Sequence, residues 1–145
     1  MKTNGGFLLT KIKQLGDRIF ERILAEKNID AFNGAQGRIL YVLWQEDGVP
    51  IKIISEKSGL AITSLTTMLE RMEKNGLISR KTDEADKRKT LLFLTDKAKK
   101  LKEAYDSVSN EMGNIYYRDF TDKEILQFEE YLNRIRVNLE EWSDK

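Results

Sequence analysis

Three consecutive cations, Lys87, Arg88 and Lys89, follow an acid, Asp86, in the second half of the chain. A projecting Arg can enter the minor groove of duplex DNA, where the potential is most negative, while neighbouring Lys residues contact the phosphates. Asp86 lies two residues before Arg88, a spacing that suits it to orient the guanidinium group and to stiffen the loop. Taken alone, such a run also fits a solvated charged turn.

A second polar group lies on the outer face of a predicted helix from about Ala61 to Asn75. The residues on this face are Thr63, Ser64, Thr66, Thr67, Glu70, Arg71 and Lys74. Short hydroxyl side chains at the amino end of a helix can bond base edges in the major groove, and a Thr methyl can meet the thymine methyl. Arg71 and Lys74 would then lie near phosphates. Hydroxyl groups begin many helices, so this face fits DNA binding and simple solvation equally well.

The composition argues against enzymatic chemistry. Neither Cys nor His occurs in the 145 residues, which removes disulfides, thiol sensors, the commonest zinc ligands and the usual general base. The paired acids Glu129 and Glu130, or Asp83 and Asp86, have no nucleophile, metal set or phosphate loop beside them. We therefore expect no enzyme, no cofactor and no metal site.

Charge is distributed unevenly along the chain, although the net charge is only +1. Residues 71–102 carry eleven Lys and Arg against five Asp and Glu, whereas residues 103–145 carry five against eleven. This asymmetry is typical of a protein in which one part faces a polyanion. The alternative is a winged-helix module for protein interaction without specific DNA binding, and the concentration of cations in one segment disfavours it.

The spacing of apolar residues predicts the elements that position these groups. A first helix spans about Phe7 to Lys27, and a second begins after Asn33, which forms a capping box with Gln36, and ends near Glu46. A short helix, Ile51 to Ser58, is closed by a left-handed Gly59. Together with the helix ending at Asn75 it makes a helix-turn-helix.

A β-hairpin and two long helices follow. Leu77 to Lys81 and Thr90 to Leu94 read as strands around the polar loop Thr82 to Lys89, which makes the hairpin a wing. Thr95 is the expected cap of one long helix, and Thr121 with Glu124 forms the capping box of another. The apolar seams of these two helices are Ala98, Leu101, Tyr105, Val108, Met112 and Ile115, and then Ile125, Phe128, Leu132, Ile135, Leu139 and Trp142.

Such seams favour packing against the first helix and against a second subunit. The predicted fold is mainly α with a small β-hairpin wing, a winged helix-turn-helix flanked by long dimerisation helices. Residues 1–32 and 96–145 form the helical dimerisation region, and residues 33–95 form the DNA-binding region of one intertwined domain. The beginning of the sequence lacks a secretion signal and no apolar run is long enough to span a membrane, so we expect a cytoplasmic protein without a membrane partner.

The wing and the helix before it together resemble the MarR (multiple antibiotic resistance regulator) family. The run from Asp86 to Thr95 matches the family's D-x-R-x5-L-T wing signature. Ser64 to Thr66, followed by Leu69 to Arg80, is similar to its recognition helix and first wing strand. The order of elements along nearly the whole chain is also that of the family.

The resemblance implies a homodimeric transcriptional regulator, usually a repressor, on a pseudo-palindromic site in double-stranded DNA. By position, Thr63, Ser64, Thr66 and Thr67 would approach bases, and Arg71 would contact the backbone. Arg88 would enter the minor groove, held by Asp86. Ile62 and Thr67 stand where many members have a cation, so the base preference is not inherited from relatives.

Many members of the family release DNA when a small, often aromatic, anion binds. Tyr41, Trp44 and Arg18 are residue types suited to line such a site. Packing in the core is the favoured interpretation of Tyr41 and Trp44. We assign no ligand residues to an effector.

Overall fold

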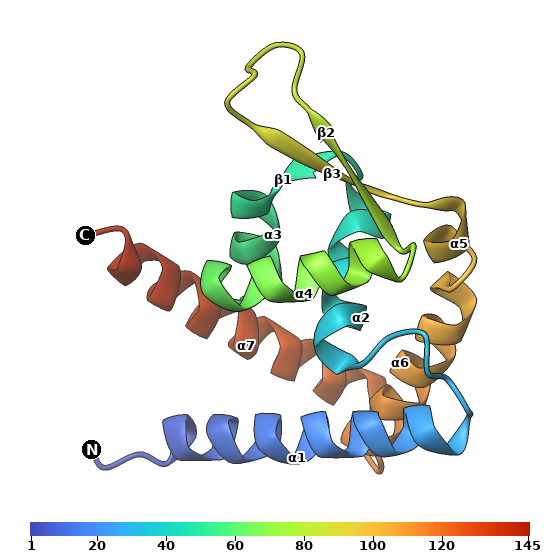
Figure 1. The fold of residues 1–145 in the computed structure, drawn as a ribbon. Helices are drawn as coiled ribbons and strands as arrows, with labels where there is room; N and C mark the ends of the chain where they lie inside the picture. Colours follow the sequence, from blue (N-terminus) through green and yellow to red (C-terminus); the bar gives the residue numbers. More distant parts are fainter. The chain divides into compact units, whose positions relative to one another are not determined.

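The computed structural model describes residues 1–145 and consists of seven helices and three short strands (Figure 1). In chain order they are α1 (Gly5–Glu26), α2 (Gly34–Gln45), β1 (Val49–Pro50), α3 (Ile51–Ser58), α4 (Ile62–Lys74), β2 (Ile78–Thr82), β3 (Thr90–Leu94), α5 (Asp96–Lys99), α6 (Lys102–Tyr116) and α7 (Asp122–Ser143). The predicted class, mainly helical with a winged helix-turn-helix, is confirmed. The chain forms two compact units, Met1–Asn110 and Glu111–Lys145.

The core of the first unit lies where α2, α3 and α4 meet the sheet. Its side chains with almost no exposed surface include Ile39, Leu40, Leu43, Ile54, Leu65, Leu69, Met72 and Leu92. Removing such side chains from water supplies the main stabilisation of a small domain, about 1.5–3 kcal/mol for each one fully buried. The buried side chains therefore hold in place the helices and strands that carry the exposed polar residues of the recognition helix and the wing.

The predicted ends of two helices are confirmed. The side chain of Asn33 accepts a 2.8 Å hydrogen bond from the amide of Gln36, and the Gln36 side chain accepts one of 3.1 Å from the amide of Asn33. Gly59 has φ of +74°, and its amide donates to the carbonyl of Ser55 at 3.0 Å. A residue without Cβ is favoured in this left-handed conformation.

The hairpin of β2 and β3 is confirmed, and a third strand joins it. Ile78 pairs with Leu94 at the base of the antiparallel hairpin, and Val49 of β1 pairs with Leu92 on the other side of β3. The sequence prediction did not include β1, because two residues ending in Pro50 are too short to show alternation.

The prediction of one continuous helix from Thr95 is wrong, since α5 ends at Lys99 and α6 begins at Lys102. The carbonyl of Ala98 accepts from the amide of Leu101 at 3.1 Å and from the indole nitrogen of Trp44 at 3.3 Å. The bond from the Leu101 amide spans three residues and tightens the chain into a turn. The bond from Trp44 occupies the same Ala98 carbonyl with a side chain of α2. Both interrupt the regular pattern of i to i−4 bonds.

In the second unit, the predicted capping box of α7 is confirmed. Thr121 accepts from the Glu124 amide at 3.1 Å, and the Glu124 carboxylate accepts from the Thr121 amide at 2.8 Å. These bonds lower the pKa of Glu124. No residue of α7 is buried in the single chain. Of the predicted apolar seam, Ile125 and Leu132 are half-buried, and Phe128, Ile135, Leu139 and Trp142 are exposed.

Candidate nucleic-acid interface

The turn between α3 and α4 fixes the direction in which α4 leaves the helix-turn-helix. The hydroxyl of Ser55 donates a 2.7 Å hydrogen bond to the carbonyl of Leu60, and the hydroxyl of Ser58 accepts one of 3.2 Å from the Leu60 amide. Ser58 is itself buried. Both hydrogen-bonding groups of Leu60 are thus held by α3, which makes the turn rigid.

One side of α4 is buried and the opposite side is exposed, as the sequence pattern predicts. Leu65, Leu69 and Met72 have no exposed surface. The exposed residues include all six predicted contact residues of this helix: Thr63, Ser64, Thr66, Thr67, Arg71 and Lys74. The amino end of α4 has no side-chain cap, which leaves the amides of its first turn available to an external acceptor such as a phosphate.

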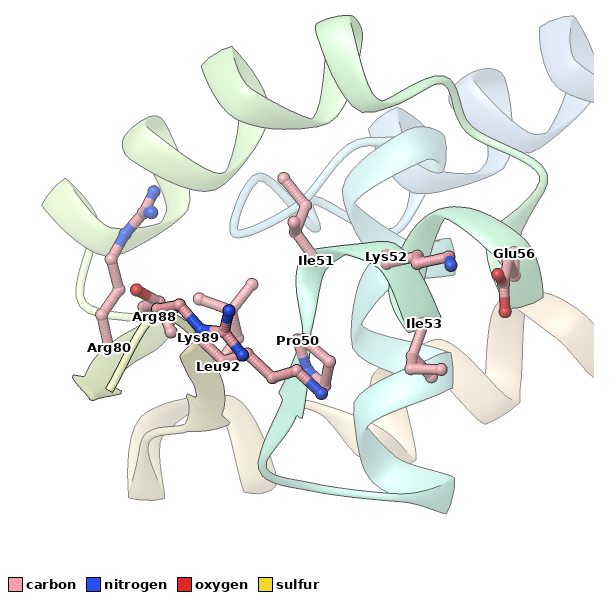
Figure 2. Close-up of a pocket in the computed structure, with 10 residues that line it drawn as sticks. Pro50, Ile51, Lys52, Ile53, Glu56, Arg80, Arg88, Lys89 and Leu92 are labelled. Carbon is pink, nitrogen blue, oxygen red and sulfur yellow. The ribbon is translucent and has the colours of Figure 1, made fainter. Parts of the chain in front are cut away.

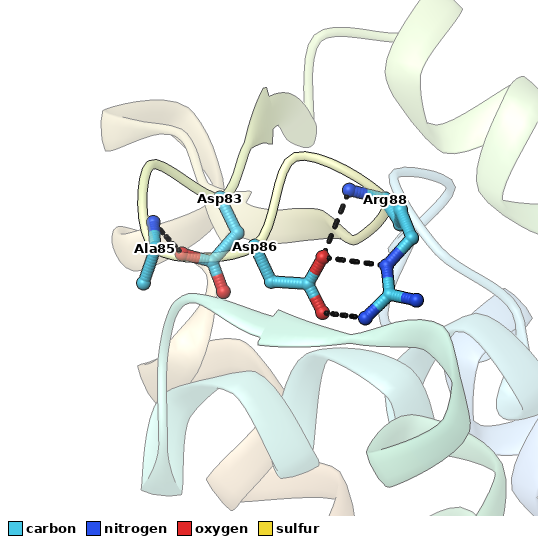
Figure 3. Close-up of polar contacts among 4 residues, drawn as sticks. All are labelled: Asp83, Ala85, Asp86 and Arg88. Atoms are coloured by element: carbon cyan, nitrogen blue, oxygen red, sulfur yellow. Dashed lines mark hydrogen bonds and ion pairs between the residues drawn. The ribbon is translucent and has the colours of Figure 1, made fainter.

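The tip of the wing brings Asp86 and Arg88 together (Figure 3). The Nε and Nη2 atoms of Arg88 donate to the two carboxylate oxygens of Asp86 at 3.1 and 3.3 Å, and the Arg88 amide donates to Oδ1 at 3.1 Å. These bonds to Arg88 hold the pKa of Asp86 below its usual value. The side chain of Arg88 remains 91% exposed, so the guanidinium is oriented by its partner yet open to solvent.

Backbone hydrogen bonds close the loop that carries this pair. The amide of Asp83 donates to the carbonyl of Lys89 at 3.0 Å, and the amide of Lys89 donates to the carbonyl of Asp86 at 3.0 Å. The Asp83 carboxylate accepts from the Ala85 amide at 2.9 Å (Figure 3). The loop is consequently a folded turn, and Lys87, Arg88 and Lys89 are all exposed on it.

A groove of about 680 Å³ lies between the wing and α3 (Figure 2). Arg80, Arg88 and Lys89 line it from the wing, and Lys52 lines it from the first turn of α3. Its remaining lining residues are Pro50, Ile51, Ile53, Glu56, Thr90 and Leu92. Four cations and one acid line the groove. Arg80 pairs with Glu73 and Arg88 with Asp86, and Lys52 and Lys89 add positive charge that suits a polyanion.

Lys52 and Arg80 were not among the predicted contact residues. Lys52 was assigned only to a short helix with an apolar face, which also carries Glu56 and Lys57, and Arg80 was assigned only to a strand. The signal that identifies Lys52 is its place at the start of the first helix of a helix-turn-helix, the helix that crosses the DNA backbone. Arg80 also lies 3.3 Å from Glu73 of α4, so this cation links the wing to the helix.

Tyr41 and Trp44 belong to an aromatic cluster around Tyr105. The ring centroids of Tyr41 and Trp44 lie 5.8 and 5.3 Å from that of Tyr105, and those of Phe20 and Phe32 both lie 6.1 Å away. Burial raises the pKa of Tyr105. The indole nitrogen of Trp44 donates to the carbonyl of Ala98, and the contacts of Trp44 agree with a packing role. Tyr41 packs against Tyr105 but is 47% exposed, so the prediction that it lies in the core is wrong.

Two features are absent from the chain. No group of three or more carboxylate side chains is placed to hold a metal ion. None of the helices is both long enough and apolar enough to cross a membrane.

Comparison with known proteins places the winged region in one family. Residues 32–90 match the model of the MarR family. The chain is 36% identical over 77 residues to the HTH-type transcriptional regulator TtmR of Methylorubrum extorquens, covering 53% of this chain and 40% of the relative. It is 42% identical over 64 residues to the organic hydroperoxide resistance transcriptional regulator of Bacillus subtilis, covering 44% of each. The chain thus spans less than half the length of these two relatives.

The fold is shared over a longer stretch. A mutant MarR from E. coli, solved in complex with operator DNA, superposes with a TM-score of 0.79 at 22% identity. The superposition covers 90% of this chain and 91% of the other. At this identity the likeness establishes the winged helix fold with its flanking helices.

Proposed function

The chain belongs to the MarR family through its winged helix-turn-helix region, and from this premise we propose that it is a transcriptional regulator that binds double-stranded DNA. It acts in the cytoplasm as a homodimer on a pseudo-palindromic operator. In this proposal the exposed hydroxyl groups at the amino end of α4 meet base edges in the major groove. Arg71, Lys74 and the wing cations meet the phosphates and the adjacent minor groove.

The observation that carries the proposal is the Asp86–Arg88 pair at the tip of the wing. A guanidinium held by a carboxylate at 3.1 Å and still 91% exposed has lost conformational freedom without gaining burial. Exposed ion pairs of this kind contribute little to stability. An arginine fixed in advance loses less entropy when it enters a minor groove, which gives the pair a use in binding.

Homodimerisation is supported by the exposed apolar side chains of two helices. Leu126, Leu139 and Trp142 of α7 are 71%, 64% and 72% exposed in the single chain. In α1, Leu8 and Ile12 are also exposed. Large apolar side chains exposed along two helices favour burial in an interface, and a two-fold dimer would cover the same residues on both copies.

We further propose that binding represses transcription, because a dimer seated on a promoter excludes the polymerase. A promoter–reporter fusion in a cell that lacks the regulator is expected to lose activity when the chain is supplied.

The DNA-binding proposal is tested by fluorescence titration of the whole chain against promoter fragments and against random duplexes of equal length. We expect at least one fragment from the neighbourhood of the coding region to bind about a thousandfold more tightly than random DNA at physiological salt. Equal binding to every duplex would reject the proposal and would leave the protein-interaction module as the better interpretation.

A further inference from the structure

The first turn of α4 carries an apolar side chain where the proposed function places DNA bases. Ile62 is the first residue of α4 and 47% of its surface is exposed. Single exposed apolar residues are common on protein surfaces. The position of Ile62, on the end of the helix that the proposed function inserts into the major groove, is what singles it out.

The other exposed residues of this end restrict how bases are read. Thr63, Ser64, Thr66 and Thr67 carry hydroxyl groups, and Ala61 before the helix adds no polar side chain. Guanine is read by paired bonds from Arg or Lys, adenine by Asn or Gln, and cytosine by Asp or Glu. None of these side chains is present between residues 61 and 67.

One of the hydroxyl groups is already engaged within the helix. The hydroxyl of Thr66 donates a 3.0 Å hydrogen bond to the carbonyl of Ile62, so its hydrogen is not available to a base. Its oxygen can only accept. Direct readout by this end is therefore left to single hydroxyl bonds, which tolerate several bases, and to apolar contact with the methyl group of thymine.

We propose that Ile62 is a specificity-determining residue that reads thymine in each operator half-site by packing against its 5-methyl group. The inference rests on the proposed function, because it assumes that α4 enters the major groove. It makes the contribution of α4 to specificity depend on thymine methyl groups rather than on paired hydrogen bonds.

The test begins with selection of bound sequences from a random duplex pool by the whole chain. In the selected operator each thymine is replaced in turn by deoxyuridine, which lacks only the 5-methyl group, and Kd is measured by fluorescence anisotropy. At one thymine in each half-site we expect the replacement to raise Kd about fourfold, as follows from uncovering one buried methyl. Replacements outside the half-sites serve as the control and leave Kd unchanged.

Two variants test whether the effect of the thymine methyl group on Kd depends on the side chain of Ile62. In Ile62→Ala the ratio of Kd between the deoxyuridine and thymine duplexes falls to about one, because the two changes remove the same contact. Ile62→Val keeps a branched side chain and retains most of the ratio. Ile62 is exposed, so neither variant disturbs the core.

Failure of the proposed role of Ile62 and failure of the proposed function give different experimental results. An operator without a methyl-sensitive thymine, or a methyl effect that persists unchanged in Ile62→Ala, would overturn the role of Ile62 while leaving sequence-specific binding in place. A selection that enriches no sequence at all would overturn the proposed function itself.

Discussion

The hydroxyl group of Thr95 donates a 2.6 Å hydrogen bond to the carbonyl of Gly76, which joins the end of β3 to the end of α4. The same hydroxyl accepts a 3.2 Å bond from the amide of Ala98, and the Thr95 amide donates to the carbonyl of Leu77 at 3.1 Å. Lys97 adds a 3.0 Å bond to the carbonyl of Asn75. These hydrogen bonds fix the base of the wing relative to the carboxyl end of α4.

Replacing Thr95 tests this junction. Thr95→Ala removes both the hydrogen bond to Gly76 and the cap of α5, and we expect it to lower the free energy of unfolding by about 1–2 kcal/mol. Thr95→Ser keeps the hydroxyl and loses less. Urea denaturation measures the difference, with Thr3→Ala, before the first helix, as the control. Equal stability of the Ala and Ser variants would contradict a role for the hydroxyl.

Asp86→Asn distinguishes a positioning role of this acid from a purely electrostatic one. Removing a negative charge from the wing should by itself strengthen binding to a polyanion. If Asp86 orients Arg88, the variant instead weakens operator binding about three- to tenfold, since charge-assisted bonds to the guanidinium are lost.

The matched control for this variant is Glu84→Gln, which makes the same charge change in the same loop without contact to Arg88. Fluorescence titration on the operator gives both affinities. Tighter binding by both variants alike would show that Asp86 does not position Arg88.

The groove between α3 and the wing predicts a phosphate contact by Lys52. We expect Lys52→Ala to weaken binding to all duplexes by a similar factor and to reduce the slope of log Kd against log salt by about one. Lys57→Ala is the matched control, because Lys57 lies on the same helix but pairs with Glu46 at 2.8 Å. An unchanged slope for Lys52→Ala would remove the groove from the interface.

Local signals in the sequence were sufficient to predict most of the winged region. Asn33 with Gln36, the left-handed Gly59, and the alternation around the wing each act within a few residues, so their geometry follows from the chain nearby. The pairing of Asp86 with Arg88 was predictable for the same reason.

Features that depend on residues distant in the chain were missed. The strand β1 exists because Val49 pairs with Leu92, and the break after α5 coincides with the contact of Trp44 with Ala98. Neither contact produces a periodic spacing of apolar residues that could be recognised in the sequence. The place of Lys52 in the groove likewise depends on how α3 packs beside β3, which the spacing of residues in α3 does not reveal.

The exposed seam of α7 predicts the effect of a charge within it. Leu139→Arg places a cation on the apolar face, and each substitution counts twice in a two-fold dimer. Losing the burial of two Leu side chains should raise the dimer dissociation constant about a hundredfold or more. Sedimentation equilibrium measures this, with Asn138→Arg on the adjacent position as the control. A dimer equally stable in both variants would exclude this face of α7 from the interface.

Tyr117 is expected to ionise later than an ordinary tyrosine. Its hydroxyl donates a 2.6 Å hydrogen bond to Glu129, and burial together with this bond raises the pKa of Tyr117 to about 12. The folded pKa thus lies above the unfolded value near 10. The stabilisation that Tyr117 provides is therefore fully present below about pH 10 and is lost as the pH rises through about 12.

Absorbance of the phenolate, followed with circular dichroism, tests this assignment among the five tyrosines of the chain. We expect Tyr117→Phe to remove the step near pH 12 and to leave the earlier part of the titration unchanged. Glu129→Gln should lower the midpoint of the late step, because a neutral acceptor no longer opposes the phenolate charge. Tyr105, whose pKa burial also raises, lies outside this pair, so a late step unchanged in both variants would belong to Tyr105 and would contradict the assignment to Tyr117.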